Sequence, residues 1–271
     1  MTSQRPEVRP TDPAAVELIT HGTIDVEGRL VDASNATLFG GISLDGLEAK
    51  CVYKPINGER PLWDFPDGTL AGREVASYLI SEASGAGLIP PTVHREGPFG
   101  AGMVQLWVDT KEGDDLVDVT APSDVPPGWK AVLHAMDRFG EPAVLAHSDN
   151  PGVALMAALD VVLNNADRKG GHVLHATDGG VYGVDHGICL HTENKLRTVL
   201  WGWMGEALPA EAVDMLRALL DALAGDLGEQ LHEHLTRREV RALVERTENL
   251  LRDNAFPEPS SEWRAIPWPA F

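Results

Sequence analysis

The stretch NNADRKGGHVL, residues 164–174, is the part of the chain that most strongly indicates its fold. It follows an apolar run typical of a buried helix and precedes a short apolar run typical of a strand. In such a loop Asp167 can orient a hydroxyl group and accept its proton during phosphoryl transfer. Arg168 and Lys169 would add positive charge beside the transferring group, and His172, five positions after the aspartate, would return along the strand to hold a metal ion. The alternative is a helix C-terminal turn with two glycines and solvated charges.

A second motif, GVDHGIC at residues 183–189, ends what the pattern predicts to be a hairpin. Two short apolar runs, 172–174 and 181–184, flank an Asp-Gly-Gly turn. Asp185 then lies where a carboxylate could bridge two magnesium ions, and the glycine that follows lets the chain turn away. The alternative is a simple turn built on the aspartate, but the spacing from the first motif favours a metal-binding hairpin.

The third motif is VYKP, residues 52–55, at the end of a predicted strand. After alternating apolar residues, Lys54 should point from the sheet toward whatever lies beneath it. Glu74 follows twenty residues later in a predicted helix, and a strand lysine held by a helix glutamate is the arrangement that positions a lysine against nucleotide phosphates. Glu82 is a competing partner, and an isolated strand-end lysine more often extends into water.

Taken in order, VYKP, the helix glutamate, NADRKGGHVL and GVDHG resemble the motifs of the phosphatidylinositol 3/4-kinase-like family. The segment KPINGERP, residues 54–61, also resembles the Lys-Pro…Glu…Pro run of type II phosphatidylinositol 4-kinases. Over nearly its full length the chain is similar to an actinobacterial group of lipid-kinase-like proteins with VYKP, RPLWDFPDGTLAGREVA and LRTVLWGW. The resemblance implies a two-lobed, protein-kinase-like α+β fold that binds nucleotide between a small β-rich N-lobe and a mostly helical C-lobe.

The resemblance also implies a role for each matching residue. Lys54 would contact the α- and β-phosphates of ATP while Glu74 holds Lys54; Asp167 would be the catalytic aspartate, with Arg168 beside it, and Asp185 the main metal ligand. Two backbone segments would complete the nucleotide site. The first is a turn that covers the phosphates through its backbone N–H groups and consists of Ser34, Asn35, Ala36 and Thr37. The second is a hinge whose backbone pairs with adenine and consists of Gln105, Leu106, Trp107 and Val108.

The metal position departs from the family, because His172 stands where the family has asparagine. Imidazole is a softer ligand than an amide oxygen and favours Mn²⁺, or even Zn²⁺, over Mg²⁺. It can also be protonated near neutral pH, which would repel a cation. The expected cofactors are ATP with Mg²⁺ or Mn²⁺, and the expected activity is phosphotransfer to a hydroxyl of a small molecule or protein. A pseudokinase that binds nucleotide without catalysis and a nucleotidyl (AMP) transferase are the alternatives.

Periodicity elsewhere predicts strands before helices. Residues 22–55 predict an antiparallel meander and residues 93–107 a further hairpin, with one helix at 70–85 between them. The C-terminal half predicts a polar hinge-side loop at 110–130, then helices over 132–139, 151–165 and within 209–254. The expected organisation is a flexible tail (1–15), an N-lobe (16–109) and a C-lobe (110–271).

Composition narrows the possible partners. The formal net charge is −19 over 271 residues, whereas nucleic acids and anionic lipid surfaces require a basic face. Neither nucleic-acid binding nor stable membrane association is therefore expected. The chain has no apolar run of about 18 residues and no basic-then-apolar start, and its two cysteines are too few for a disulfide framework. These features predict a cytoplasmic protein.

A cluster of metal-ligating residue types allows a rival interpretation. His172, His175, His186, Cys189 and His191 lie within twenty residues and could form a zinc site across the hairpin. Structural zinc usually takes two close pairs with a tight knuckle, which this spacing lacks. We therefore expect His175 and His191 to be turn residues and Cys189 to be a small buried side chain.

Overall fold

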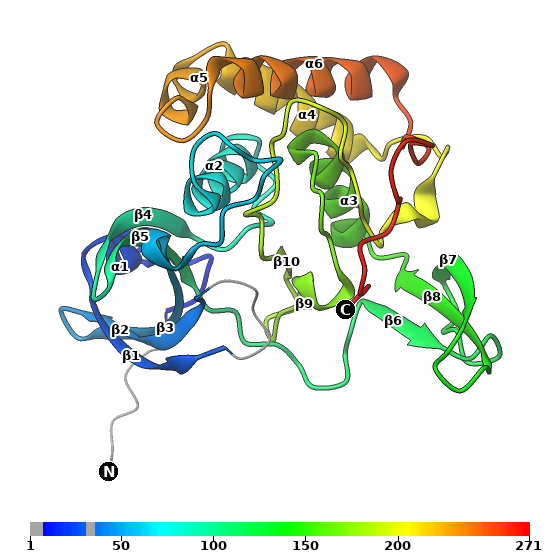
Figure 1. The fold of residues 1–271 in the computed structure, drawn as a ribbon, viewed down its shortest axis with the longest axis horizontal. Helices are drawn as coiled ribbons and strands as arrows, with labels where there is room; N and C mark the ends of the chain where they lie inside the picture. The colour runs from blue at the N-terminus through cyan, green and yellow to red at the C-terminus, as the bar shows by residue number, and fades with distance from the viewer. Residues whose placement is uncertain (1–7, 31–35) are drawn as a thin grey trace.

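The N-terminal part of the computed structural model, which describes residues 8–30 and 36–271, is built on a five-stranded antiparallel sheet (Figure 1). The strand order is β1-β2-β3-β5-β4. The strands are β1 (Thr23–Arg29), β2 (Leu38–Leu44), β3 (Leu47–Pro55), β4 (Thr92–Gly97) and β5 (Gly100–Leu106). Asp45 and Gly46 have φ angles of 48° and 86°, as a tight turn between β2 and β3 requires. The predicted meander and hairpin are confirmed.

Two helices flank this sheet. The short helix α1 (Ala15–His21) lies against one face, where Leu18 and Ile19 are fully buried. The longer helix α2 (Leu70–Ala83) connects β3 to β4 and begins at Thr69, whose hydroxyl accepts the Gly72 N–H at 2.9 Å. This confirms the helix predicted over 70–85. Met103 of β5 packs against α2, whereas the next residue, Val104, packs against α1, so the two helices lie on opposite faces of the sheet. Helix α2 lies on the side of the helical part of the molecule.

A three-stranded antiparallel sheet extends from the other end of the molecule (Figure 1). It consists of β6 (Val117–Thr120), β7 (Trp129–Met136) and β8 (Pro142–Ser148), in the order β6-β8-β7. The helix predicted over 132–139 is therefore wrong, and β6 and the start of β7 lie within the loop predicted over 110–130. A bulge between Ala131 and Leu133 breaks the alternation of β7, and this edge strand is largely exposed, so burial imposes no period-two pattern on it.

The helical part follows β8. It contains α3 (Pro151–Leu163), α4 (Ala210–Leu223), α5 (Asp226–Leu231) and α6 (Arg237–Asp253), together with the short hairpin β9 (Val173–His175) and β10 (Val181–Gly183). The Asn150 side chain accepts the Gly152 N–H at 2.8 Å and begins α3, and Asn164 ends it in the left-handed conformation with φ 54°. The 3₁₀ turns Gly170–His172 and Trp201–Trp203 also belong to this part, whereas the 3₁₀ turn Ile56–Gly58 follows β3.

The main hydrophobic core lies among the helices and includes one face of α2. Ile80 from α2, Leu159 from α3, Leu216 from α4 and Leu243 from α6 are all fully buried in it. A smaller core lies between α1 and the five-stranded sheet. The fold-class prediction, an α+β fold with a β-rich N-terminal region and a helical C-terminal part, is confirmed. In the described part of the chain, no helix combines the length and apolar character needed to cross a membrane.

The chain finally folds back across the helical part (Figure 1). The Ala265 carbonyl accepts the Thr198 N–H at 3.0 Å, and the Ala270 carbonyl accepts the Gly170 N–H at 2.8 Å. The C-terminal segment thus lies against the loop that contains Asp167.

His147 of β8 predicts how stability depends on pH. Its Nε2 accepts the Gly202 N–H at 3.0 Å, so the neutral ring joins the small sheet to the Trp201–Trp203 turn. Burial lowers its pKa below the ordinary value of 6.5. Because only the unfolded chain protonates this histidine just below pH 6.5, stability is retained above that pH and lost as the pH falls toward the folded pKa.

The amide oxygen of His147→Gln can still accept the Gly202 N–H. We expect this variant to have a shallower fall in unfolding free energy between pH 7 and 5, because unfolding takes up at most one proton fewer than in the wild type. Urea denaturation at a series of pH values measures the two slopes. Equal slopes in the wild type and the variant would contradict the assignment.

Candidate functional site

Three charged side chains from distant parts of the chain meet at one point. The Lys54 ammonium at the end of β3 lies 2.6 Å from Oε1 of Glu74 in α2. It lies 2.8 Å from Oδ1 of Asp185, in the segment after β10. Glu82, the competing partner, is exposed. The structure thus brings together the lysine, the helix glutamate and the hairpin aspartate that the sequence singled out.

Local structure explains why each side chain points to this place. In β3, Cys51 and Tyr53 face the α1 core, so the alternating position of Lys54 faces α2. Asp185 has a φ of 61°, a left-handed conformation that non-glycine residues rarely adopt. The next amide, the His186 N–H, donates to Oε2 of Glu74 at 2.8 Å. Glu74 therefore binds both the lysine and the backbone of the aspartate turn.

Electrostatics keep this cluster charged. Burial would lower the pKa of Lys54, but the carboxylates of Asp185 and Glu74 outweigh it and raise that pKa. The Lys54 ammonium in turn lowers the pKa of Asp185 well below the usual range for aspartate. Burial raises the pKa of Glu74, an effect that Lys54 and the His186 N–H oppose. The Asp185 carboxylate, whose side chain is 50% exposed, therefore remains ionised and accessible to a cation.

Asp167 lies in the loop after α3, next to this cluster. Its backbone N–H donates to Oδ1 of Asn165 at 2.9 Å, and the Lys169 ammonium lies 3.7 Å from its Oδ2. Burial raises the pKa of the Asp167 carboxyl, Lys169 lowers it and Asp185 raises it further. The net rise makes Asp167 a better proton acceptor than an exposed aspartate. Lys169 thus supplies the positive charge expected near this aspartate.

Arg168 lies elsewhere than expected. Its guanidinium is fully buried and forms a paired interaction with the equally buried Asp160 of α3, with Nε 2.9 Å from Oδ2 and Nη2 2.9 Å from Oδ1. It also donates to the Val184 carbonyl at 3.0 Å and the His172 carbonyl at 3.2 Å. The prediction that Arg168 adds charge beside a transferring group is therefore wrong; Arg168 instead ties the Asp167 loop to the β9–β10 hairpin.

Sequence reasoning missed Asp160, although a signal for it was present. It is the one charged residue within the otherwise apolar stretch VALMAALDVVL, residues 153–163. A charge on the buried face of a helix requires a buried counter-charge. That rule pointed to a nearby arginine that would face inward.

His172 is placed to share a cation with Asp185. Its Nε2 lies 3.5 Å from Oδ2 of Asp185, and its Nδ1 is buried without a hydrogen-bond partner among the described residues. Burial lowers the pKa of His172 to about 4, so the ring is neutral at pH 7. A neutral ring carries no positive charge that would repel a cation. A neutral imidazole beside a carboxylate fits Mn²⁺, with phosphate oxygens needed to complete the coordination.

The four histidines and one cysteine of the rival zinc interpretation do not converge. Nε2 of His186 lies 2.7 Å from the Arg168 guanidinium, Cys189 packs in the main core, and Nδ1 of His191 accepts the Glu193 N–H at 2.9 Å. Across residues 8–30 and 36–271, no three His, Cys, Asp or Glu side chains form a group that could hold a metal ion by themselves. Any metal at Asp185 and His172 thus depends on ligand oxygens.

Two adjoining cavities surround the charged cluster. The larger, of about 550 Å³, is lined by apolar residues of the sheet and by all four predicted hinge residues, Gln105, Leu106, Trp107 and Val108. The smaller, of about 130 Å³, is lined by Asp167 and Lys169. Both are lined by Thr37, Lys54, His172 and Asp185. The charged cluster therefore stands where a largely apolar cavity opens toward the loop of Asp167.

The predicted hinge is only partly available for pairing. The Leu106 and Trp107 N–H groups donate to the carbonyls of Pro91 at 2.9 Å and Lys50 at 3.0 Å, and the Gln105 side-chain amide donates to the Thr92 hydroxyl at 2.8 Å. Among the described residues, the Val108 N–H has no hydrogen-bond partner. Adenine pairing through the whole segment is thus ruled out in this arrangement, whereas pairing at Val108 is open.

The predicted phosphate-covering turn lies partly beyond the described residues. Ser34 and Asn35 are outside them. The Ala36 N–H donates to the Gly58 carbonyl at 3.2 Å and so is not free for phosphate, which contradicts that part of the prediction. Thr37 lines both cavities.

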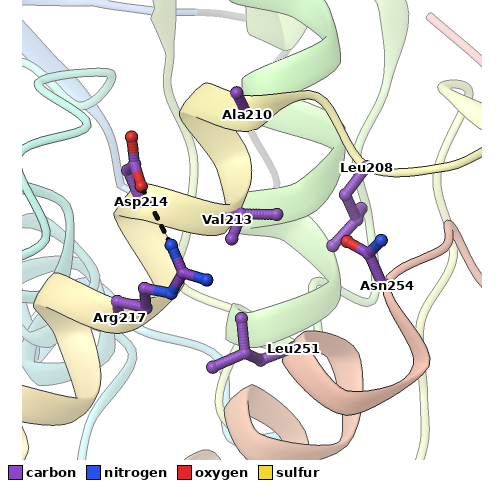
Figure 2. Close-up of a pocket in the computed structure, with 7 residues that line it drawn as sticks. All are labelled: Leu208, Ala210, Val213, Asp214, Arg217, Leu251 and Asn254. Atoms are coloured by element: carbon purple, nitrogen blue, oxygen red, sulfur yellow. Dashed lines mark hydrogen bonds and ion pairs between the residues drawn. The ribbon is translucent and has the colours of Figure 1, made fainter.

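A separate hollow between the start of α4 and the end of α6 offers no comparable chemistry (Figure 2). Leu208, Val213 and Leu251 supply apolar walls. Its charged members, Asp214 and Arg217, lie 3.4 Å apart within one helix and pair with each other at the surface. Nothing there is buried and unpartnered.

Comparison with known proteins identifies one close relative. No family model matches the chain. Protein Rv2133c of Mycobacterium tuberculosis (strain ATCC 25618 / H37Rv) is 48% identical over 263 residues, which cover 94% of each chain. Among solved structures, the crystal structure of the golgi casein kinase is similar with a TM-score of 0.46 and 12% identity, over 90% of this chain and 75% of that one. A likeness this distant says nothing about activity.

The paired interaction of Arg168 with Asp160 predicts a large stability effect. We expect Arg168→Met to lower the free energy of unfolding by about 3–5 kcal/mol, because the buried Asp160 carboxylate would lose its counter-charge. Urea denaturation measures the change. The neighbouring Lys169→Met is the matched control, and its partly exposed pair should change stability by no more than about 1 kcal/mol. Equal losses in both variants would contradict the buried-pair assignment.

Proposed function

This chain belongs to the family of Protein Rv2133c, and we propose that it is an ATP- and divalent-metal-dependent phosphotransferase that acts on a hydroxyl group of a small molecule or protein. One observation carries the proposal. The Lys54 ammonium lies between Glu74 at 2.6 Å and Asp185 at 2.8 Å, and it lines both cavities, the smaller of which also contains Asp167. A cation, a metal-ligating carboxylate and a proton acceptor on adjoining cavity walls are what phosphoryl transfer needs.

The nucleotide base and its phosphates would occupy different parts of the larger cavity. Val52, Leu106 and Leu174 give it apolar walls suited to an aromatic base, and its volume of about 550 Å³ suits a nucleotide-sized ligand. The Val108 N–H, which has no hydrogen-bond partner among the described residues, would donate to the base. Lys54 lines both cavities, and its ammonium would contact the phosphates where the cavities adjoin.

Asp185 and His172 would hold the metal ion. The carboxylate keeps its charge because Lys54 lowers its pKa, and the neutral imidazole supplies a nitrogen lone pair. A bound Mg²⁺ or Mn²⁺ would neutralise developing charge on the phosphate oxygens. The mixed carboxylate and imidazole donor set favours Mn²⁺.

Asp167 would orient the acceptor hydroxyl and receive its proton. It lines the smaller cavity, and its raised pKa suits a group that accepts a proton late in the reaction. Lys169, 3.7 Å from it, lies where its charge would stabilise the transferring group. The net charge of −19 disfavours an extended polyanionic acceptor.

Replacement of Asp185 tests nucleotide and metal binding. We expect Asp185→Ala to weaken the binding of ATP with Mn²⁺ by at least about tenfold, because the main metal ligand is lost and Lys54 would remain paired with Glu74 alone. Isothermal titration calorimetry measures the affinity. Asp178→Ala, in the turn between β9 and β10, is the matched control and should bind as the wild type does.

Unchanged affinity in Asp185→Ala would contradict the proposal, as would a wild type that binds no nucleotide. Intact mass spectrometry and an ATP-consumption assay then separate the classes of activity. Phosphate transfer supports the proposal. Transfer of AMP would assign the nucleotidyl alternative, and tight binding without turnover would assign a pseudokinase.

Replacement of Asp167 separates catalysis from binding. We expect Asp167→Asn to lower kcat by about 10²–10⁴-fold while ATP affinity stays within about threefold, because the amide keeps the shape but cannot accept the proton. Steady-state ATP turnover and calorimetry give the two quantities. Loss of affinity with unchanged kcat would instead assign Asp167 to nucleotide binding.

A further inference from the structure

We infer that Arg73 is a positioning residue that holds α2 and the Asp185 turn in one arrangement, with Glu239 of α6 as its buried counter-charge. The effect of Arg73 on catalysis rests on the proposed function. Its effect on the position of α2 and the Asp185 turn can be measured without any ligand.

Arg73 is buried deeply and bonded on several sides. It is 1% exposed, and one of its terminal nitrogens forms an ion pair with Glu239. The other, Nη1, donates to the Cys189 carbonyl at 2.9 Å, and Nη2 also donates to the Asp67 carbonyl at 3.1 Å. The Phe65 ring lies 5.0 Å from the guanidinium carbon. Such a network fixes both the rotamer of Arg73 and the segments that it contacts.

The adjacent residue of α2 holds the same turn from its other end. Glu74 accepts the His186 N–H at 2.8 Å, whereas Arg73 binds the Cys189 carbonyl at 2.9 Å. Neighbouring residues of one helix turn thus hold both ends of residues 186–189. This segment follows Asp185 directly, so its position sets where the Asp185 carboxylate can lie.

A second arginine holds the residue before the aspartate. The Arg168 guanidinium donates to the Val184 carbonyl at 3.0 Å. Asp185 itself has a left-handed backbone, with a φ of 61°, which persists only where the surroundings impose it. Val184 and Cys189, on either side of it, are each bound by a buried arginine. The surroundings that impose the conformation include Arg73.

Glu239 connects this arrangement to the helical part. It is 4% exposed, and its Oε2 accepts the Thr236 N–H at 2.8 Å in the capping box that begins α6. Its Oε1 is the atom that pairs with Arg73. A buried pair of this kind is often less stabilising than apolar packing, so its value here lies in fixing one geometry. The pair sets the position of α2, and therefore of Glu74, relative to α6.

The test compares Arg73→Met and Glu239→Gln with Arg246→Met. Arg246 of α6 is a partly buried arginine that donates to the Val162 carbonyl at 2.9 Å and the His191 carbonyl at 3.0 Å, and among the described residues it makes no hydrogen bond to α2. Its replacement therefore reproduces the loss of a guanidinium that binds two carbonyl groups but not the loss of an anchor on α2. Hydrogen exchange of the His186 amide, which donates to Glu74, is the ligand-free readout.

We expect the His186 amide to exchange at least about tenfold faster in both test variants than in the Arg246→Met control, at equal global stability set with urea. We also expect both test variants to bind ATP with Mn²⁺ at least about fivefold more weakly than the control. Arg73→Lys should recover part of this affinity, because lysine keeps the positive charge but lacks the planar set of guanidinium donors. If Arg73→Met does not fold, Glu239→Gln carries the test.

Exchange at His186 that matches the control in the folded variants would overturn the inference. An ATP affinity equal to that of the control, together with this unchanged exchange, would overturn it as well. A wild type that binds no nucleotide would instead contradict the proposed function and leave the exchange result to decide the positioning role of Arg73.

Discussion

The ammonium group of Lys54, held between the carboxylates of Glu74 and Asp185, is the interaction on which the rest of this structure depends. A partly buried ammonium is stabilised where opposite charge surrounds it closely. This pairing draws together a strand end, the first turns of α2 and the turn after β10. The two cavities adjoin where these three elements meet, because this cluster forms part of both their walls.

A second set of buried charges supports the first. Arg168 with Asp160 and Arg73 with Glu239 are almost completely removed from water, and neither arginine lines either cavity. Both bind backbone carbonyls beside Asp185, at Val184 and Cys189. Carbonyl groups in a short irregular turn have no regular partners, and arginine, with five donors in a fixed plane, can satisfy several at once. The precise course of the turn thus depends on side chains outside the site.

The sequence predicted some of these features well because they follow local rules. The alternation of β3 places Lys54 opposite to Cys51 and Tyr53, and helical spacing places Glu74 in the first turns of α2. The strand over 129–136 was mistaken for a helix because it is an exposed edge with a bulge, where burial leaves no periodic pattern. The sequence predicts Arg168 beside the transferring group because it follows Asp167 in the loop, whereas the buried Asp160 draws its guanidinium inward.

By itself, the sequence determined which residues carry charge at the ends of which elements, since propensity and periodicity act between near neighbours. The order and spacing of these residues, together with the resemblance to the phosphatidylinositol 3/4-kinase-like family, identified Lys54, Glu74, Asp167 and Asp185 as one set. Only the tertiary structure decided which charges face the cavities and which are buried in pairs. The cost of removing a charge from water is offset only by partners such as Asp160 or Glu239, and these become neighbours only when the chain has folded.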